Sequence, residues 1–277
     1  MYVEVLHSPA KINLGLWVVD KRPDGYHEIF TLYHTVDFYD RIIIQEHPFV
    51  EVKTTTLEIK QEENIVYKAI SLFESYTGIE QNLRVIIEKN IPVGGGLGGG
   101  SSNAATVLNY LNQKHDNILP EEKLFEIALK LGADVPFFLK GGFAIGEGIG
   151  EKLTFLPKKL NEKIFIIYPN VLSNTRSVYS KVNKSILTKK EDLNIILSLI
   201  NEFDINKLEP YIENKLGFLA MDLYPQIKEV YNFLKHLGYS PKVSGSGSCV
   251  YVIGDPSLEV EKAVAIKNWK LIKTKLK

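Results

Sequence analysis

Cysteine and long apolar runs are scarce in this sequence of 277 residues, and each shortage excludes a class of protein. The single cysteine, Cys249, has no partner for an intrachain disulfide, so a disulfide-stapled scaffold is excluded. No stretch approaches the ~20 apolar residues of a membrane-spanning helix, and the first residues lack a basic segment followed by an apolar one. We therefore expect a cytoplasmic protein that is neither exported nor embedded in a membrane.

An excess of charge of either sign is also missing, because 33 basic residues balance 33 acidic ones. This balance gives no electrostatic reason to expect a nucleic-acid or membrane partner, so the expected partner is a small molecule. Only four of the basic residues are arginines, at positions 22, 41, 84 and 176. Few planar guanidinium groups are therefore available to bind phosphate, and a phosphate site would depend on backbone amides or lysine.

The composition that is present is typical of a globular protein, with 45% hydrophobic and 24% charged residues. The length favours two domains. Pro157 and the two lysines after it mark a plausible boundary, which gives an N-terminal domain of residues 1–157 and a C-terminal domain of residues 158–277. Helical and strand patterns mix without a regular strand–helix alternation, so we predict two α+β domains.

Apolar periodicity predicts the order of the elements. The first third is rich in separate strand-like runs, and helices are predicted over residues 64–76 and 120–131. Further helices are predicted near residues 175–183, 191–202, 223–237 and 257–268. Strands are expected at residues 83–89, 143–145 and 152–155, over the runs KIFIIYP and WKLIKTKL, and on both sides of SGSGS.

A glycine-rich segment lies between an apolar strand and a helical pattern, and six of its seven residues from 94 to 100 are glycine. Glycines let a ligand approach the backbone, and the first-turn amides of a helix are free donors. Such a loop therefore predicts an anion site, and several amides together suit a polyphosphate. A flexible linker is the alternative, but linkers do not usually join a strand to an amphipathic helix.

The segment differs from three familiar phosphate-binding sequences. Gly94, Gly96 and Gly99 satisfy the spacing G-x-G-x-x-G of a dinucleotide site, but another helical stretch follows where a strand ending in an acidic residue is required. No Lys-Ser or Lys-Thr follows the glycines, which excludes the Walker A loop. The signatures of a protein kinase are also missing.

Residues 92–105, PVGGGLGGGSSNAA, strongly resemble the nucleotide loop of the GHMP small-molecule kinases. This loop is the second motif of that superfamily. Its first motif is matched by SPAKINL at residues 8–14 and its third motif by SGSGS at residues 244–248. Within it, RPDGYHEI at residues 22–29, GGGLGGGSSNAA and GADVPFF at residues 132–138 resemble the 4-diphosphocytidyl-2-C-methylerythritol kinases of the non-mevalonate isoprenoid pathway. The three motifs together span nearly the whole chain.

The resemblance implies a fold, a reaction and an acceptor site. It implies an N-terminal β-rich kinase domain, a C-terminal ferredoxin-like domain, and an active site between them that transfers phosphate from ATP to the tertiary 2-hydroxyl of the CDP-linked alcohol. Asp134 would accept the hydroxyl proton beside Lys11, whose ammonium would stabilise the developing alkoxide. Substrate binding would involve Asn13, Tyr26, His27 and Tyr179, with cytosine stacked and hydrogen-bonded by the last three.

The resemblance also implies where ATP binds. Lys89 and Asn64 are candidates near the adenine. Mg²⁺ is expected to arrive with ATP, with the Ser102 hydroxyl as one possible ligand and the others unknown. The third motif, with Gly245, Ser246 and Gly247, would approach the reacting phosphate, although it could also be a tight β-turn. The loop residues expected at the phosphates are Pro92, Val93, Gly94, Gly95, Gly96, Leu97, Gly98, Gly99, Gly100, Ser101 and Ser102.

Two other functions remain open from the sequence. The first is a GHMP kinase for another small alcohol of the mevalonate or homoserine type, which would make DGYHEI incidental. The second is a catalytically silent nucleotide-binding module, because a fold alone never establishes activity.

Overall fold

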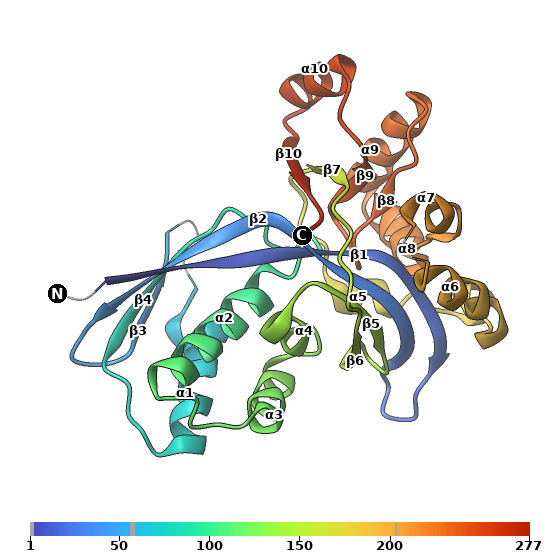
Figure 1. Ribbon diagram of the computed structural model, residues 1–277. Coiled ribbons are helices and arrows are strands. Elements are labelled where there is room, and N and C mark those ends of the chain that lie inside the picture. The colour runs from blue at the N-terminus through green and yellow to red at the C-terminus, as the bar shows by residue number, and fades with distance from the viewer. Residues whose placement is uncertain (1–2, 56–58, 203) are drawn as a thin grey trace. The chain divides into compact units, whose positions relative to one another are not determined.

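The computed structural model describes residues 3–55, 59–202 and 204–277 (Figure 1). Packing groups them into two compact units, neither of which is continuous along the chain. The glycine loop, residues 92–102, belongs to both, because Val93–Leu97 lies in unit 2 and the residues on either side lie in unit 1. The predicted division after residue 157 stays a prediction. Unit 1 comprises Met1–Ala10, Phe38–Pro92 and Gly98–Gly141, and unit 2 comprises Lys11–Asp37, Val93–Leu97 and Gly142–Lys277.

Two long strands contribute to both units. β1 (Val3–Lys21) pairs with β2 (His27–Glu46), and each covers two runs that the sequence suggested as separate strands. No glycine or asparagine turn interrupts either strand, and Pro9 lacks only an amide donor, which an extended strand tolerates at some positions. The middle of β1 is buried on both faces, from Ala10 to Trp17. Polar groups in that stretch must therefore find hydrogen-bond partners inside the protein.

Unit 1 combines three strands with helices. The end of β2 pairs antiparallel with β4 (Leu83–Glu88), which pairs in parallel with β3 (Glu51–Thr54). The alternating burial of β4 matches its period-two apolar pattern. Figure 1 shows the helices gathered together: α1 (Ile65–Thr77), α2 (Gly99–Lys114), α3 (Glu121–Leu131) and α4 (Val135–Lys140), with the short 3-10 turn η1 (Gln61–Glu63) before α1.

The predicted helix at residues 64–76 is confirmed as α1, one residue later. The Asn64 side chain accepts a hydrogen bond from the Val66 amide at 2.9 Å, and Gly78 ends the helix in the left-handed region at φ 72°. α3 is also confirmed, whereas α4 was not predicted. Its apolar sequence and six-residue length give no helical period that a pattern could reveal.

Unit 2 contains a four-stranded antiparallel sheet of order β10-β7-β9-β8, formed by β7 (Lys163–Tyr168), β8 (Lys242–Val243), β9 (Val250–Ile253) and β10 (Lys270–Lys275). β5 (Phe143–Glu147) and β6 (Lys152–Phe155) form a hairpin, and β5 pairs with the start of β2. Side chains from the sheet pack in one core with Leu16 and Val18 of β1. These strands agree with the predicted runs.

Several helices of unit 2 contribute side chains to that core. The helix predicted at 223–237 is α9 (Pro225–His236), and the other predicted helices are α5 (Thr175–Tyr179), α6 (Leu193–Ile200) and α10 (Leu258–Ile266). The sequence did not predict α7 (Ile205–Leu208) or α8 (Lys215–Leu223), and three short 3-10 turns complete the unit: η2 (Lys184–Ile186), η3 (Lys190–Asp192) and η4 (Glu209–Tyr211). Among the residues described, no helix combines the length and apolarity that crossing a bilayer requires.

Candidate active site

Lys11 and Asn13 lie on the buried middle of β1 and are 3% and 2% exposed. Neither is the solvated strand residue that an isolated lysine or asparagine usually is. The Lys11 ammonium donates to Asn13 Oδ1 at 2.5 Å and lies 5.4 Å from the centre of the Tyr33 ring. Asn13 Nδ2 in turn donates to Thr31 Oγ1 at 2.7 Å. The first motif therefore holds a lysine in a fixed, dry position.

The glycine loop uses backbone conformations that favour glycine. Gly94, Gly96 and Gly98 have φ values of 66°, 75° and 69°. At Gly96 a side chain is also excluded by space, because an added Cβ would lie 2.1 Å from the Ser244 carbonyl oxygen. The Lys11 amide donates to the Leu97 carbonyl at 3.0 Å. Gly94 and Gly98 thus provide a positive φ. Gly96 provides a positive φ and also lets the loop backbone pack directly on the Ser244 carbonyl.

The third motif and the adjoining Cys249 hold the first half of the loop, residues 94–97, by donating hydrogen bonds to the loop's carbonyl groups. The Ser248 amide donates to Gly94 O and the Cys249 amide donates to Gly95 O, both at 3.0 Å. Ser244 Oγ donates to Gly96 O at 3.0 Å. Three consecutive carbonyls therefore point toward residues 244–249, so this face of the loop is occupied by protein and not by a ligand.

The third motif is itself held by side chains from elsewhere in unit 2. Asn214 Nδ2 donates to the carbonyls of Val243 and Gly245, at 2.7 and 2.6 Å, and its Oδ1 accepts from the Gly217 amide. Ser173 Oγ donates to the Ser246 carbonyl at 2.6 Å. Gly245 faces the first motif, since an added Cβ would lie 3.1 Å from Asn13 Oδ1 and 3.7 Å from Lys11 Nζ. The segment is therefore more than a β-turn, because it joins the first and second motifs.

The second half of the loop opens α2, which has 16 residues and begins after Gly98 without a side-chain cap. Free first-turn amides and the helix dipole make such an end attractive to an anion. The fully buried Ser102 accepts a hydrogen bond from Ser8 Oγ, with 2.7 Å between the hydroxyl oxygens. Ser8 of the first motif thereby anchors this half of the loop.

Lys89 and Asn64, predicted near the adenine, both have structural partners. Lys89 forms an ion pair with the fully buried Asp40, whose other oxygen accepts from the amides of Asn90 and Ile91. An added Cβ at Gly99 would lie 2.8 Å from Lys89 Nζ, so this ammonium reaches the loop. Asn64 caps α1, as described above. Their contacts with ATP stay predictions.

Two of the predicted cytosine-binding residues, Tyr26 and His27, lie where the hairpin turn meets β2, and the third, Tyr179, is the last residue of α5. His27 is buried, and its ring stacks on Tyr179 with 5.5 Å between centres and 24° between planes. Burial, with a smaller effect of Lys21, lowers the pKa of His27, so its ring is neutral and can both donate and accept. Tyr26 is 60% exposed and has its ring available to a ligand.

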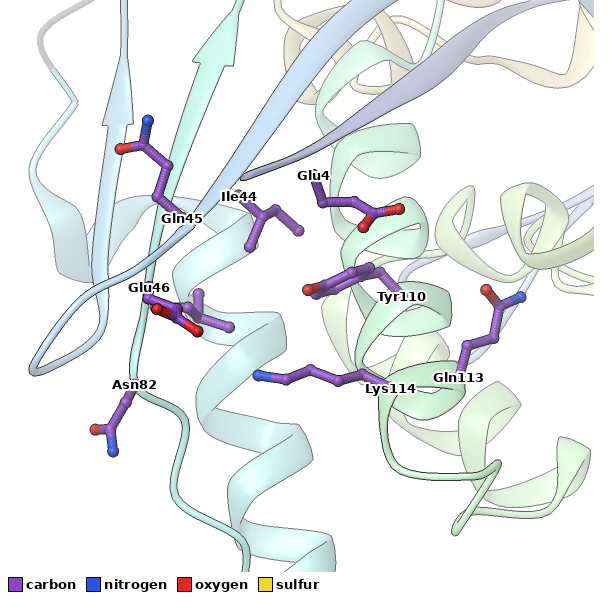
Figure 2. A pocket seen from close by; sticks show the side chains of 9 residues that line it. Glu4, Ile44, Gln45, Glu46, Asn82, Tyr110, Gln113 and Lys114 are labelled. Carbon is purple, nitrogen blue, oxygen red and sulfur yellow. The ribbon is translucent and has the colours of Figure 1, made fainter. Parts of the chain in front are cut away.

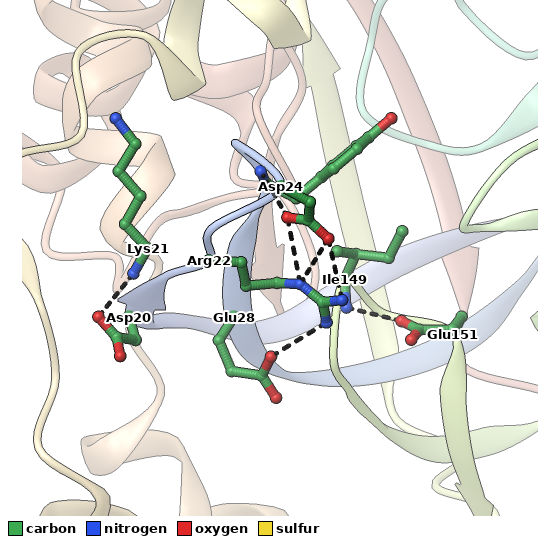
Figure 3. A network of polar contacts seen from close by, with 8 residues as sticks. Asp20, Lys21, Arg22, Asp24, Glu28, Ile149 and Glu151 are labelled. Atoms are coloured by element: carbon green, nitrogen blue, oxygen red, sulfur yellow. Dashed lines mark hydrogen bonds and ion pairs between the residues drawn. The ribbon is translucent and has the colours of Figure 1, made fainter.

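Polar contacts hold that hairpin (Figure 3). The Arg22 guanidinium contacts Asp24 at 3.0 Å and Glu28 at 3.4 Å, and Asp24 Oδ1 accepts from the Tyr26 amide. The hydrogen bond from Arg22 lowers the pKa of Asp24 and keeps it ionised. One of the few arginines thus fixes the turn before Tyr26 and His27.

Asp134 lies in unit 1 at the N-cap position of α4, where it caps no amide with its side chain. The four residues after it are buried, so the start of α4 is fixed by packing. Lys11 belongs to unit 2, and the pairing of Asp134 with Lys11 stays a prediction.

Unit 1 also contains a pocket of about 360 Å³ between Glu4 of β1, Ile44 of β2, and Tyr110 and Lys114 of α2 (Figure 2). Burial, and to a lesser degree Glu4, raises the pKa of Tyr110. None of the residues predicted from the motifs lines this pocket, so it has no part in the predicted chemistry.

Sequence reasoning missed Thr31, Asn214 and the joining role of Ser244. Each is a single polar residue in an apolar or loop segment, and its partners lie far away along the chain. No group of three or more His, Cys, Asp or Glu side chains that could hold a metal occurs among the residues that the structure describes.

Comparison with known proteins agrees with this arrangement. The model of the GHMP kinases N terminal domain matches residues 64–142, and that of the GHMP kinases C terminal domain matches residues 189–268. A 4-diphosphocytidyl-2-C-methyl-D-erythritol kinase of Sulfurihydrogenibium sp. (strain YO3AOP1) is 86% identical over 99% of this chain and 100% of its own length. Its counterpart from Persephonella marina (strain DSM 14350 / EX-H1) is 56% identical over the same shares.

Solved structures show the same likeness. The crystal structure of a 4-(cytidine 5'-diphospho)-2C-methyl-D-erythritol kinase has a TM-score of 0.81 and 32% identity, covering 99% of both chains. A homoserine kinase from Cytophaga hutchinsonii ATCC 33406 has a TM-score of 0.70 at 18% identity over 99% of this chain and 95% of its own, which shows the fold alone.

The fold and the three joined motifs define a small-molecule kinase of the GHMP class. The chain belongs to the GHMP kinases and, within them, to the family of the 4-diphosphocytidyl-2-C-methyl-D-erythritol kinases. The predicted two-domain GHMP kinase fold with mixed helices and sheets is thereby confirmed.

Proposed function

We propose that this chain transfers the terminal phosphoryl group of ATP to the 2-hydroxyl of 4-diphosphocytidyl-2-C-methyl-D-erythritol. The observation that carries the proposal is the full-length similarity to relatives named for that reaction, at 86% and 56% identity. The structure supports it, because residues of the first, second and third motifs are joined by hydrogen bonds within unit 2. Cytoplasmic location stays a prediction, as does the absence of nucleic-acid and membrane partners.

Backbone amides between residues 94 and 101 are proposed to hold the phosphates, whereas the Ser102 amide donates to Gly98 O within the helix. The carbonyls of Gly94, Gly95 and Gly96 are occupied by the third motif, so the loop presents its glycine backbone and not its acceptors. The uncapped start of α2 adds the positive end of a helix dipole. A chain with four arginines needs such donors to bind a triphosphate.

Mg²⁺ would neutralise phosphate charge and align the transferred group. The donor set fits an ion held mainly by phosphate oxygens, since the described part of the chain has no cluster of carboxylates and histidines. Ser102 remains the proposed protein ligand. Its oxygen accepts one hydrogen bond from Ser8 and keeps a second lone pair that an ion could use.

The acceptor is proposed to bind through its base and its alcohol. Tyr26 offers an exposed ring for stacking, and neutral His27 offers a hydrogen bond to the cytosine edge. Asn13 and Lys11 would face the methylerythritol hydroxyls. Asp134 would take the proton from the 2-hydroxyl, and the Lys11 ammonium would stabilise the oxygen as its charge develops.

Product analysis tests the reaction. Three samples of the protein are incubated with Mg-ATP. Each contains one acceptor: the CDP-linked alcohol, mevalonate or homoserine. We expect a product one phosphoryl group heavier only from the CDP-linked alcohol, with ³¹P NMR placing the new group on the 2-hydroxyl. Turnover of mevalonate or homoserine instead would assign another alcohol kinase, and no ATP consumption with any acceptor would assign a silent module.

The role of Asp134 is tested with Asp134→Asn in the same assay. General-base catalysis is typically worth ~10² to 10⁴ in rate, so kcat should fall by about that factor while both KM values change little. Glu121→Gln, an exposed acidic residue in the first turn of α3, is the matched control and should retain full turnover. Near-normal kcat in Asp134→Asn would remove Asp134 from the role of base.

A further inference from the structure

We infer that Thr31 is a positioning residue for the proposed phosphoryl transfer, which sets the orientation of the Asn13 amide and, through it, the position of the Lys11 ammonium. The inference rests on the proposed function for the role of Lys11. Its own basis is a buried chain of hydrogen bonds from Gly15 through Thr31 and Asn13 to Lys11.

The direction of each bond in this chain is fixed by chemistry. Thr31 Oγ1 lies 2.8 Å from the Gly15 carbonyl oxygen, which can only accept, so the single hydroxyl proton of Thr31 is directed there. The Thr31 oxygen must then accept from Asn13, so the amide nitrogen of Asn13 faces Thr31 at 2.7 Å. This leaves Oδ1 of Asn13 facing Lys11, whose ammonium can only donate.

Burial restricts the positions that the groups in this series of hydrogen bonds can take. Thr31 is fully buried, and Asn13 and Lys11 are almost so, which leaves little room for water to replace a lost partner. The methyl group of Thr31 packs toward Gly146, where an added Cβ would lie 3.0 Å from Thr31 Cγ2. The threonine is therefore held on its apolar side while its hydroxyl is held by the two polar partners.

The third motif depends on the same asparagine. The Asn13 amide of the backbone donates to Ser244 Oγ at 3.3 Å, and the Gly245 position faces Asn13 Oδ1. A change in the side-chain orientation of Asn13 would therefore alter the place where Lys11 and the third motif meet. Thr31 need not contact a substrate to affect turnover.

Thr31→Val is the deciding variant, because it keeps the shape and the methyl group but removes the hydroxyl. Without an acceptor, Asn13 Nδ2 loses its partner, and the amide can rotate away from Lys11. A displacement of about 1 Å at a reacting group costs on the order of 10²-fold in rate. We expect kcat to fall about 10- to 100-fold with KM for ATP changed less than about threefold.

Three controls separate positioning from general damage. Thr31→Ser keeps the hydroxyl and should restore most of kcat. Thr35→Val removes a hydroxyl on the same strand that also accepts one bond, from the Gly142 amide, and donates another, to the Lys277 carbonyl. It should lower the thermal midpoint as much as Thr31→Val does, without lowering kcat. In an Asn13→Ala background, Thr31→Val should have no further effect on kcat, because Thr31 acts through Asn13.

A crystal structure of Thr31→Val tests, without an activity assay, whether Thr31 orients Asn13. Asn13 Oδ1 should no longer lie within hydrogen-bond distance of Lys11 Nζ, whereas in Thr31→Ser it should. If wild-type protein phosphorylates no acceptor, the proposed function fails, and the crystal structures still decide whether Thr31 orients Asn13. Unchanged kcat and an unchanged Asn13 in Thr31→Val, or full additivity with Asn13→Ala, would overturn the inference.

Discussion

The two halves of the glycine loop each contain three glycines but are held by different means. Residues 94–97 lie in unit 2, where the carbonyls of Gly94, Gly95 and Gly96 are fixed by residues 244–249. Residues 98–102 lie in unit 1 and follow from the geometry of a helix start, with Gly98 as the N-cap. A run of glycine is therefore not uniformly flexible, because distant contacts hold the backbone carbonyls of one half, whereas helix geometry sets the backbone of the other and Ser8 anchors its last residue.

The comparison also separates two uses of glycine. Gly96 has a positive φ and no space for a side chain. Gly100 is helical, and an added Cβ would meet only Ile65 Cγ2, at 3.7 Å. The same substitution should therefore have opposite effects in the two halves, which the following experiments are designed to measure.

Gly96→Ala should have the largest effect. Its Cβ would meet the Ser244 carbonyl, and its φ of 75° is strained for alanine. Overpacking and backbone strain together should lower the free energy of unfolding by about 3 kcal/mol. Chemical denaturation measures this, with ATP-dependent turnover as a second readout. A loss below about 1 kcal/mol would mean that the first half of the loop moves easily away from the third motif.

Acid should destabilise unit 2 because of His34. Unit 2 contains the first half of the glycine loop. The Leu160 amide donates to His34 Nε2 at 3.0 Å, so the buried ring must be neutral, and burial lowers its pKa from 6.5 to about 4. The unfolded state therefore binds a proton as the pH falls below 6.5, while the folded state does not until about 4. Stability is present above pH 6.5 and is lost below it, by about 2 kcal/mol at pH 5.

Hydrogen exchange at pH 7.5 and pH 5 locates that loss. Amides of β7 and β9 in unit 2 should lose opening free energy, whereas those of α2 in unit 1 should lose less. His34→Gln should flatten the pH dependence, and His236→Gln, at an exposed position, should leave it unchanged. Equal losses in both units would show that the two halves of the loop are not stabilised independently.

Ser244→Ala should have a moderate effect on the first half. It removes the hydroxyl that accepts from the Asn13 amide and donates to Gly96 O, which costs about 1 to 2 kcal/mol in the free energy of unfolding. Denaturation of this variant beside Ser240→Ala, which alters an exposed serine, isolates the contribution. Equal stability of the two variants would mean that backbone contacts alone hold Gly96.

The same division explains how much the sequence could predict. Local patterns predicted α1, α3, the start of α2 and the strands of unit 2, because capping, periodicity and glycine stops act over a few residues. The docking of Gly96 on Ser244 joins residues 148 positions apart, and no local pattern encodes it. Resemblance placed the motifs, but Thr31 and Asn214 emerged only when their partners were located in space.

The smallest expected effect is that of Gly100→Ala in the second half, and its sign is the informative part. Gly100 is exposed, helical and free of crowding, so alanine should reduce the entropy of the unfolded chain and favour the helix. The free energy of unfolding should rise by about 0.5 to 1 kcal/mol, measured by denaturation without ligand. ATP affinity is measured separately, because the added methyl group could crowd a bound phosphate. Destabilisation without ligand would mean that the start of α2 is held by more than helix geometry, and the contrast between the two halves would then weaken.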